Sequence, residues 1–427
     1  MARPRPNFQT RPAPATVDRD LTIERIGAQG DGVAAGPVYA PMTLPGEHVR
    51  VRQTGDRAEL LEVLQASPDR AEAPCPHFGA CGGCALQHWA ATPYLAWKSG
   101  LIAGELARAG ITTDILPPFA SPPGSRRRLA LHARPERERE ARLGYKARGS
   151  WRLIDIEVCP IADPRLQAAF PALRRLAAPL LEHAKSAPTL HVTWTESGLD
   201  VDVTGVERRS GGLSADRRLQ VAEVAAETDM ARVTLAGEIL YQARQPVVRL
   251  GKAVVALPPG AFLQAVPEAE AAMTSFTLEA LAGAGRVADL FCGVGTFALR
   301  LAEIAQVSAA DSSPECAVAL GAAVGAAPGL RGVKVEARDL FRRPMLAQEM
   351  KGLDGAVFDP PRAGAPAQAA EIASSGLSRA VGVSCNPVSF ARDARILVDA
   401  GFRLERVLPV DQFLWSPHVE LVGVFSR

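Results

Sequence analysis

The chain has 427 residues, with 48 lysines and arginines against 46 aspartates and glutamates, so its formal net charge is only +2. Hydrophobic residues make up 47% and charged residues 22%, which is ordinary for a globular protein with two or three domains. The first twenty residues lack the apolar stretch of a secretory signal, and no run approaches the ~18 apolar residues that span a bilayer, so we expect a monomeric cytoplasmic protein without membrane contact.

The N-terminal half divides into three segments. Residues 1–20 are rich in arginine and proline and are expected to form a disordered tail. Residues 21–68 contain short alternating segments separated by glycines, which predicts a small OB-like antiparallel barrel. Residues 69–255 predict a central region of mixed α+β structure, with helices over 94–109 and 165–184 and no clear period elsewhere.

The C-terminal segment, residues 256–427, has a different pattern. From Gly285 onward, apolar runs alternate with alanine-rich helical stretches, and this alternation predicts an α/β domain with a doubly wound parallel sheet. Two further strands are expected over 402–410 and 419–425. The apolar runs of the parallel sheet are 286–291, 305–310, 355–358 and 379–384.

Arginines are concentrated between Arg126 and Arg152. This stretch holds nine arginines and one lysine against three glutamates, a local excess of +7. Arginine binds phosphate through two parallel hydrogen bonds, so the stretch is a candidate RNA contact. The interleaved glutamates favour the alternative, a solvated hairpin face.

Four of the seven cysteines have the spacing of a metal site. Cys75, Cys81 and Cys84 form a C-x5-C-x2-C pattern, and Cys159 lies far downstream before a proline. Four thiolates suit either zinc or a four-iron cluster, and the spacing does not decide between them. Unrelated buried cysteines are the remaining alternative.

The predicted parallel sheet carries a candidate cofactor pocket. Asp-Leu-Phe-Cys-Gly-Val-Gly-Thr-Phe (289–297) lies where a buried strand turns into a helix, and Asp311 ends the next strand 22 residues after Asp289. Glycines allow a ligand to approach the backbone closely, and such a carboxylate can accept both hydroxyls of a ribose. This pattern suits S-adenosylmethionine or a nicotinamide cofactor, although the third glycine of a dinucleotide fingerprint is missing.

Three further motifs follow at strand ends. Asp-Pro-Pro-Arg (359–362) and Ser-Cys-Asn-Pro (384–387) each follow an apolar run, where open parallel sheets bind ligands, and His-Val-Glu (418–420) begins the last strand. Cys385 is followed by a loop signal, so a nucleophile is favoured over an inert buried thiol. Glu420 at such a position is ordinarily a solvated edge residue.

Taken in order, these four motifs resemble those of the RNA uracil-5 methyltransferases, most closely the bacterial 23S ribosomal RNA enzymes that make 5-methyluridine. The resemblance implies methyl transfer from S-adenosylmethionine to carbon 5 of a uridine, with Cys385 as nucleophile and Glu420 as proton-abstracting base. It also implies a set of cofactor contacts at Gln264, Phe291, Thr296, Asp311, Asp339 and Asp359.

The same resemblance bears on the metal and on the RNA. The ribosomal RNA enzymes carry a TRAM-like barrel and a four-iron, four-sulfur cluster, here implied on Cys75, Cys81, Cys84 and Cys159. Transfer RNA enzymes of the family generally lack both features, so ribosomal RNA is the favoured substrate and transfer RNA the alternative. The chain departs from the family at Val266, commonly asparagine, while Thr296, Asp311 and Asp339 are polar substitutions of the usual residues.

Three other functions compete with this hypothesis. An RNA cytosine-5 methyltransferase also uses a cysteine, but presents it in a different sequence context without the late His-Val-Glu. A nicotinamide oxidoreductase is disfavoured by the incomplete glycine pattern. A non-catalytic RNA-binding protein is disfavoured because both Cys385 and Glu420 are present.

Overall fold

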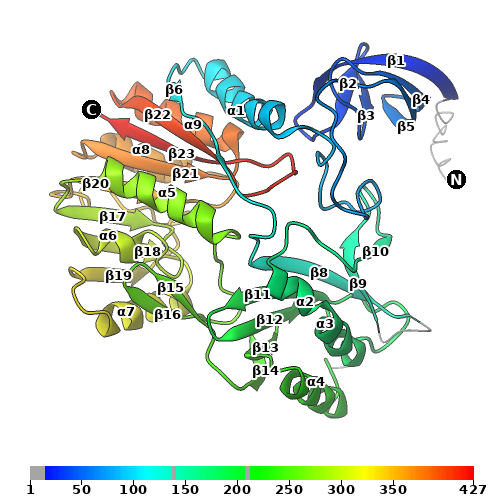
Figure 1. The fold of residues 1–427 in the computed structure, drawn as a ribbon. Coiled ribbons are helices and arrows are strands. Elements are labelled where there is room, and N and C mark those ends of the chain that lie inside the picture. The colour runs from blue at the N-terminus through cyan, green and yellow to red at the C-terminus, as the bar shows by residue number, and fades with distance from the viewer. Residues whose placement is uncertain (1–14, 137–140, 207–211) are drawn as a thin grey trace, which may run out of the picture. The chain divides into compact units, whose positions relative to one another are not determined.

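The computed structural model describes residues 15–136, 141–206 and 212–427, and these form two compact units (Figure 1). The first unit comprises residues up to 73 together with 85–94, and the second comprises 74–84 and 95–427. Most of the predicted tail, and residues 137–140 of the arginine-rich stretch, lie outside the described residues. In the described part of the chain, no helix combines the length and apolar character needed to cross a membrane.

The first unit is a closed five-stranded barrel, which confirms the barrel predicted from the sequence. Buried side chains such as Leu21, Ile23, Val49 and Val51 alternate with exposed ones and fill its interior. The strands follow the order β1-β2-β3-β5-β4, with bounds β1 Thr16–Ile26, β2 Gly32–Ala34, β3 Val38–Ala40, β4 His48–Thr54 and β5 Arg57–Gln65.

Strand β1 includes residues 16–20, which the sequence pattern assigned to the tail. Asp18 and Asp20 stand on the exposed side of β1 and pair with Arg52 and Arg50 of β4, each at 2.9 Å. Cross-strand pairs of opposite charge favour this register, although exposed pairs contribute little to stability.

The second unit begins with a central seven-stranded sheet, on which three short helices and one turn of 3-10 helix pack. Pro171 and Pro179 divide the single helix expected over 165–184, because proline lacks the N–H that a helix interior requires. The sheet has the order β10-β9-β8-β11-β12-β13-β14, and its elements are β8 Arg128–Arg134, β9 Arg142–Lys146, β10 Leu153–Asp155, α2 Pro164–Ala168, α3 Phe170–Ala177, the 3-10 turn Ala178–Leu180, β11 Thr189–Thr195, β12 Gly198–Thr204, α4 Ala215–Glu227, β13 Arg232–Leu235 and β14 Glu238–Gln242.

The rest of the second unit is built on a nine-stranded sheet, which confirms the doubly wound α/β domain. Strands β19, β18, β17, β20 and β21 are parallel neighbours in that order, and β23 is antiparallel to both β21 and β22. Two short strands, β6 and β7, pair with β22, and the hairpin β15–β16 precedes the domain. The bounds are β6 Asp114–Ile115, β7 Phe119–Ala120, β15 Val247–Leu250, β16 Ala253–Ala256, β17 Arg286–Leu290, β18 Gln306–Asp311, β19 Val333–Ala337, β20 Gly355–Phe358, β21 Arg379–Ser384, β22 Arg403–Asp411 and β23 Glu420–Ser426.

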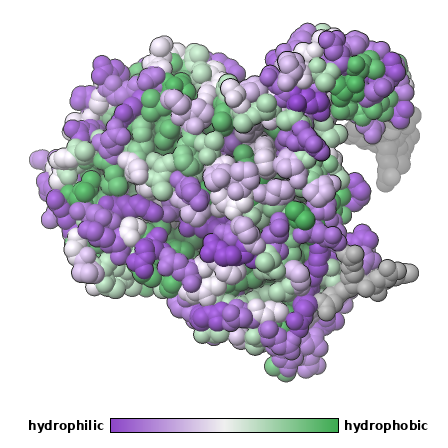
Figure 2. All heavy atoms as spheres, in the orientation of Figure 1, coloured by the Kyte–Doolittle hydropathy of each residue, from purple (hydrophilic) through white to green (hydrophobic). Residues whose placement is uncertain are grey.

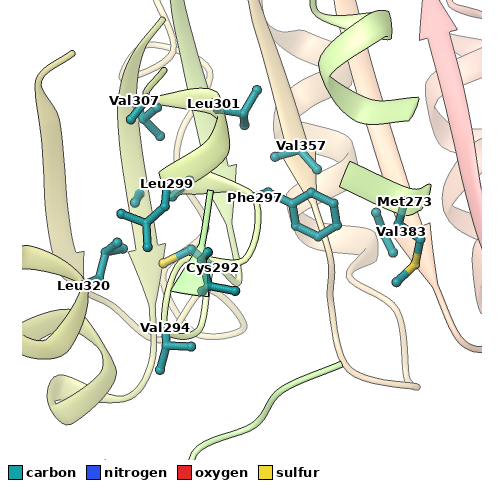
Figure 3. Close-up of a cluster of buried hydrophobic side chains, with 14 of the residues drawn as sticks. Met273, Cys292, Val294, Phe297, Leu299, Leu301, Val307, Leu320, Val357 and Val383 are labelled. Atoms are coloured by element: carbon teal, nitrogen blue, oxygen red, sulfur yellow. The ribbon is translucent and has the colours of Figure 1, made fainter. Parts of the chain in front are cut away.

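Helices cover both faces of this sheet (Figure 1). Val287 points to one face and Ala288 to the other, so both faces are buried, as in other parallel sheets. One face packs against α5 (Pro267–Ala280), α6 (Ala298–Leu301) and α7 (Pro314–Ala326), and part of this packing is shown in Figure 3. The other packs against α1 (Ala91–Arg108), α8 (Pro366–Ser374) and α9 (Pro387–Asp399). The surface in Figure 2 is a mosaic of hydrophilic and hydrophobic side chains, as is usual for proteins.

A buried ion pair connects the central sheet to the segment that leads into the α/β domain. Arg232 of β13 is 1% exposed and donates two hydrogen bonds of 2.8 Å to the carboxylate of Asp200 on β12. Its remaining donors reach the carbonyl oxygens of Leu257 and Pro258, at 2.8 and 3.3 Å. The guanidinium therefore fixes the start of the 258–265 segment, which lines the cavity described below.

Replacing Arg232 with alanine should lower the free energy of unfolding by about 3–5 kcal/mol, because Asp200 would be left buried without its cation. Denaturant unfolding followed by circular dichroism measures this loss. Arg175→Ala is the matched control, since Arg175 pairs with Glu227 on the exposed surface of the same region and its loss should change stability little. Equal stability of the two variants would contradict the structural role of Arg232.

Candidate active site

The strand order brings three motif residues to one edge of the nine-stranded sheet. Parallel strands β20 and β21 end next to Asp359 and Cys385. Strand β23 runs in the opposite direction, with Leu421 opposite Ser384, so its first residue, Glu420, lies at the edge where β21 ends. The strand order also reverses between β17 and β20, and ligands bind outside the carboxyl ends of strands at such a reversal.

A cavity of about 730 Å³ lies at this edge. Its lining includes six of the eight predicted catalytic and cofactor residues: Gln264, Phe291, Asp311, Asp359, Cys385 and Glu420. Thr296 and Asp339 are both described, and neither belongs to this lining. The Thr296 carbonyl accepts a hydrogen bond from Arg300, and the Asp339 carboxylate accepts the N–H groups of Phe341 and Arg342.

The loop after β17 is shaped by its backbone. Phe291 and Gly293 both have positive φ, 65° and 53°, which turns the chain sharply as it leaves the strand. Gly295 has φ of 100°, and a Cβ there would lie 2.5 Å from Leu320, so a larger residue would clash. Asp311 holds this loop by accepting the N–H of Gly293 at 2.9 Å.

The Asp311 carboxylate is positioned by two backbone groups. Besides the N–H of Gly293, it accepts the N–H of Ser313, also at 2.9 Å. Each carboxylate oxygen thereby uses one lone pair and keeps another for a ligand. A donor such as a ribose hydroxyl would therefore meet an acceptor whose orientation is already fixed.

The segment around Cys385 is tied to the Asp-Pro-Pro-Arg loop. Asn386 caps α9 by accepting the N–H of Val388 at 3.2 Å, and its amide donates to the carbonyl of Arg362 at 3.1 Å. Ser389 donates to the same carbonyl at 3.0 Å. These bonds hold Cys385 beside the loop that carries Asp359.

The surroundings of Cys385 disfavour its thiolate. Burial raises the pKa of Cys385 to about 11, with further contributions from the nearby charges of Glu420 and Asp359. Arg362 acts in the opposite direction. Burial also raises the pKa values of Asp359 and Glu420 above the ordinary carboxylate range, and the charge of Asp359 adds to the rise at Glu420.

Two glutamine side chains connect the carboxylates of Asp359 and Glu420. The amide of Gln264 donates to Asp359 at 3.2 Å, and the amide of Gln412 donates to Glu420 at 3.1 Å and to the Gln264 oxygen at 2.7 Å. The sequence motifs did not identify Gln412. It lies two residues after the expected strand 402–410 and directly after the observed β22. Its place at the cavity would have been predictable had the directions of the last two strands been known.

The arginines at the start of the basic stretch have partners within the protein. Arg127 pairs with Glu270 at 2.6 Å and donates to the carbonyl of Gln264 at 3.0 Å. Arg128 donates to the carbonyl of Leu263 at 2.7 Å and lines the cavity, as does Arg126. These contacts place Arg127 in the support of the cavity wall, while Arg126 and Arg128 line the cavity itself, so the RNA contact of this stretch stays a prediction.

The four predicted metal cysteines all lie in the second unit. Burial raises the pKa of Cys159 to about 11, and the charges of Cys75 and Cys81 add to the rise, which places these thiols near one another. Tyr145 lies within electrostatic reach of Cys81, Cys84 and Cys159. However, no group of three or more His, Cys, Asp or Glu in the described part of the chain has the geometry of a metal site.

Comparison with known proteins gives three informative relatives. An uncharacterized RNA methyltransferase of Caulobacter vibrioides is 61% identical over 96% of this chain and 100% of its own length. The 23S rRNA (uracil(1939)-C(5))-methyltransferase RlmD of Chromohalobacter salexigens is 34% identical over 98% of this chain and 91% of its own length. The crystal structure of Pyrococcus abyssi tRNA (uracil-54, C5)-methyltransferase with S-adenosyl-L-homocysteine has a TM-score of 0.72, with 21% identity, 95% of this chain covered and 100% of that chain. No protein-family model matches the chain.

The fold is therefore that of the S-adenosylmethionine-dependent methyltransferases, joined to an N-terminal barrel. The sequence relatives go further than the fold, because they cover nearly the whole chain at 34–61% identity. The chain belongs to the RNA uracil-C5 methyltransferase family, and it is an enzyme that methylates RNA.

Proposed function

We propose that this protein transfers a methyl group from S-adenosylmethionine to carbon 5 of a uridine in 23S ribosomal RNA, through a covalent bond between Cys385 and carbon 6. The observation that supports it most directly is the gathering of Cys385, Glu420 and Asp359 in one cavity with Asp311 and Phe291. This cavity thus combines a nucleophile, a base and the elements of a cofactor site.

The residues around Asp311 fit S-adenosylmethionine. Its carboxylate offers prearranged acceptors for the ribose hydroxyls, and Phe291 and Cys316 line the cavity with apolar surface beside it. Gly293 presents open backbone, because a Cβ there would meet nothing within 4 Å. When bound, the cofactor supplies an electrophilic methyl group.

Cys385 would activate carbon 5 of the uracil ring for methylation. Carbon 5 of uracil is a weak nucleophile, and bonding of the Cys385 sulfur to carbon 6 moves the ring electrons toward carbon 5 and the carbonyl oxygen. Because the pKa of Cys385 is raised to about 11, the resting thiol is protonated at neutral pH. Its proton therefore passes to a water molecule as the carbon–sulfur bond forms, and the nearby positive charge of Arg362 favours this loss.

Glu420 would complete the reaction. After methylation, carbon 5 carries both a methyl group and a proton. Glu420 removes this proton, the electron pair restores the double bond between carbons 5 and 6, and the Cys385 sulfur leaves as thiolate. Burial raises the pKa of Glu420 to about 8, so its charged form is a stronger base than an ordinary carboxylate, and the fraction of Glu420 in that form grows as the pH rises toward this value.

The choice of ribosomal over transfer RNA rests on the sequence relative and on the accessory segments. RlmD acts on 23S rRNA by its name and aligns with 98% of this chain. The barrel and the cysteine-bearing segment are the features implied for ribosomal RNA enzymes. The similarity to the transfer RNA enzyme, at 21% identity, concerns the fold.

We further propose that Cys75, Cys81, Cys84 and Cys159 hold a four-iron, four-sulfur cluster. The four thiols supply the full donor set, and backbone N–H groups point at two of the sulfurs: Gly83 donates to Cys81 at 3.4 Å, and Ile161 and Ala162 donate to Cys159. Such hydrogen bonds stabilise thiolate ligands. The cluster would connect the 75–84 segment to Cys159, next to the basic β9–β10 hairpin, and have no part in the chemistry.

Replacing Asp311 with alanine should weaken binding of S-adenosylhomocysteine roughly tenfold or more, because it removes the acceptors for two hydroxyl groups and frees Gly293. Asp339→Ala is the control, and should change affinity at most a few-fold, since Asp339 lies outside the cavity lining. Isothermal titration calorimetry measures both. A larger loss in Asp339→Ala than in Asp311→Ala would contradict this placement of the cofactor.

Cys385→Ala and Glu420→Gln should fail at different steps on unmodified 23S ribosomal RNA. Cys385→Ala should form neither product nor adduct. Glu420→Gln should lose about a hundred- to ten-thousand-fold in turnover and accumulate methylated RNA joined to the protein, because only elimination needs the base. The adduct should survive denaturing gel electrophoresis and disappear on nuclease digestion.

Normal turnover of Glu420→Gln would place the base elsewhere, and methylation by Cys385→Ala would overturn the nucleophile. Wild-type enzyme that methylates transfer RNA but not 23S ribosomal RNA would overturn the assigned substrate.

Protein purified without oxygen should be brown, with absorption at about 400 nm and about four irons per chain. Cys81→Ser should lose iron and folded yield, whereas Cys316→Ser, at a cysteine on α7, should keep its iron. Iron analysis and absorption spectra make the measurement. Colourless protein with one tightly bound zinc would overturn the iron assignment.

A further inference from the structure

Both the oxygen and the NH2 group of the Gln412 side chain form hydrogen bonds at the cavity. The side chain is 2% exposed, and its oxygen accepts the backbone N–H of Ala265 at 3.0 Å. A backbone N–H can only donate, so the amide orientation is fixed by chemistry: the oxygen faces Ala265 and the NH2 group faces Glu420 and Gln264.

The orientation of the Gln412 amide determines which group donates in the hydrogen bonds from Gln412 to Gln264 and from Gln264 to Asp359. Gln412 donates to the Gln264 oxygen, which leaves the NH2 group of Gln264 to donate to Asp359. The carboxylates of Asp359 and Glu420 therefore each receive an N–H, and both are held as acceptors. An N–H donor favours the charged form of a carboxylate, in opposition to burial.

The backbone on both sides of Gln412 is fixed by one buried cation. Lys98 of α1 is fully buried, pairs with Asp411 and donates to the carbonyl of Phe413 at 3.1 Å. Buried ion pairs contribute little net stability, and their better-attested use is to specify one conformation. Here the Lys98–Asp411 pair fixes the backbone and thereby determines where the Gln412 side chain enters the cavity.

We propose that Gln412 is a positioning residue for the methylation reaction, which fixes Glu420 as a proton acceptor and seats Gln264 against Asp359. The inference rests on the proposed function, because it takes Glu420 to be the base. It adds a residue outside the four sequence motifs. It also relates the buried Lys98–Asp411 pair to the active site, because that pair fixes the backbone on both sides of Gln412.

The test is the pH dependence of kcat/KM in Gln412→Met, which keeps the size of the side chain and removes its hydrogen bonds. Loss of the N–H donor leaves the raised pKa of Glu420 unopposed, so the rise of activity with pH should shift to higher pH. At neutral pH kcat should fall roughly ten- to a hundredfold, with KM for RNA little changed. Other ionisable groups near Glu420 are unaltered: Asp359 and Arg362 after β20, Cys385 after β21, Lys98 on α1, Asp411 on β22, and His418.

The matched control is Gln368→Met. Gln368 is also fully buried in the α/β domain, where its amide bonds the N–H and carbonyl of Met345 at 2.8 and 3.0 Å, and it does not line the cavity. It should lose stability as Gln412→Met does while its pH profile stays that of the wild type. Should Gln412→Met fail to fold, Gln412→Glu keeps the shape and the Ala265 contact, replaces the donor by an acceptor, and should shift the profile in the same direction.

The possible outcomes separate the two proposals. If Glu420→Gln stalls as an adduct and the folded Gln412 variant keeps the wild-type profile, the positioning role of Gln412 is overturned and the proposed function stands. If Glu420→Gln turns over normally, the proposed base fails, and with it the role of Gln412. A shifted profile in Gln412→Met, with an unshifted one in Gln368→Met, supports the inference.

Discussion

Two carboxylates that line one cavity, the half-buried Asp359 and the buried Glu420, determine the character of this active site. Burial raises the pKa values of both carboxylates and of the neighbouring Cys385, and the charge of Asp359 adds to the rise at Glu420 and, with that of Glu420, to the rise at Cys385. A site built in this way keeps its nucleophile protonated at rest and its base strong. Reaction then depends on an arriving substrate to change the surroundings of the thiol, and a free thiol of raised pKa is also less exposed to oxidation.

The geometry of these groups follows from one topological feature. If the last strand ran parallel to its neighbours, Glu420 at its start would lie at the far edge of the sheet from Cys385. Strand β23 is antiparallel and sits between β21 and β22, which run in the same direction as each other. The ends of β21 and β22 and the start of β23 therefore meet, and Cys385, Gln412 and Glu420 reach one cavity.

The sequence predicted the parallel sheet well because long apolar runs with intervening helices leave a clear period. It also predicted the motif residues at strand ends, since side chains there can be placed by direction alone. The seven-stranded central sheet was not predicted, because its strands are short and carry no clear period, and its order depends on two pairings between strands that are not hairpin neighbours, β8 with β11 and β12 with β13. Thr296 and Asp339 show a further limit: a motif position predicts the loop a residue belongs to, while the packing of that loop decides whether its side chain reaches the cavity.

The arginines just before and within β8 change how the positive charge of this stretch is interpreted. An excess of +7 between Arg126 and Arg152 counts every guanidinium equally. Arg127 and Arg128 are occupied with Glu270 and with backbone carbonyls, and Arg134 donates to the carbonyl of Ser186 at 3.1 Å. Counterion release on RNA binding depends only on cations that can reach phosphate. The number of cationic side chains available to RNA phosphate is therefore smaller than the count from the sequence. The remaining arginines stabilise the protein through internal hydrogen bonds and ion pairs.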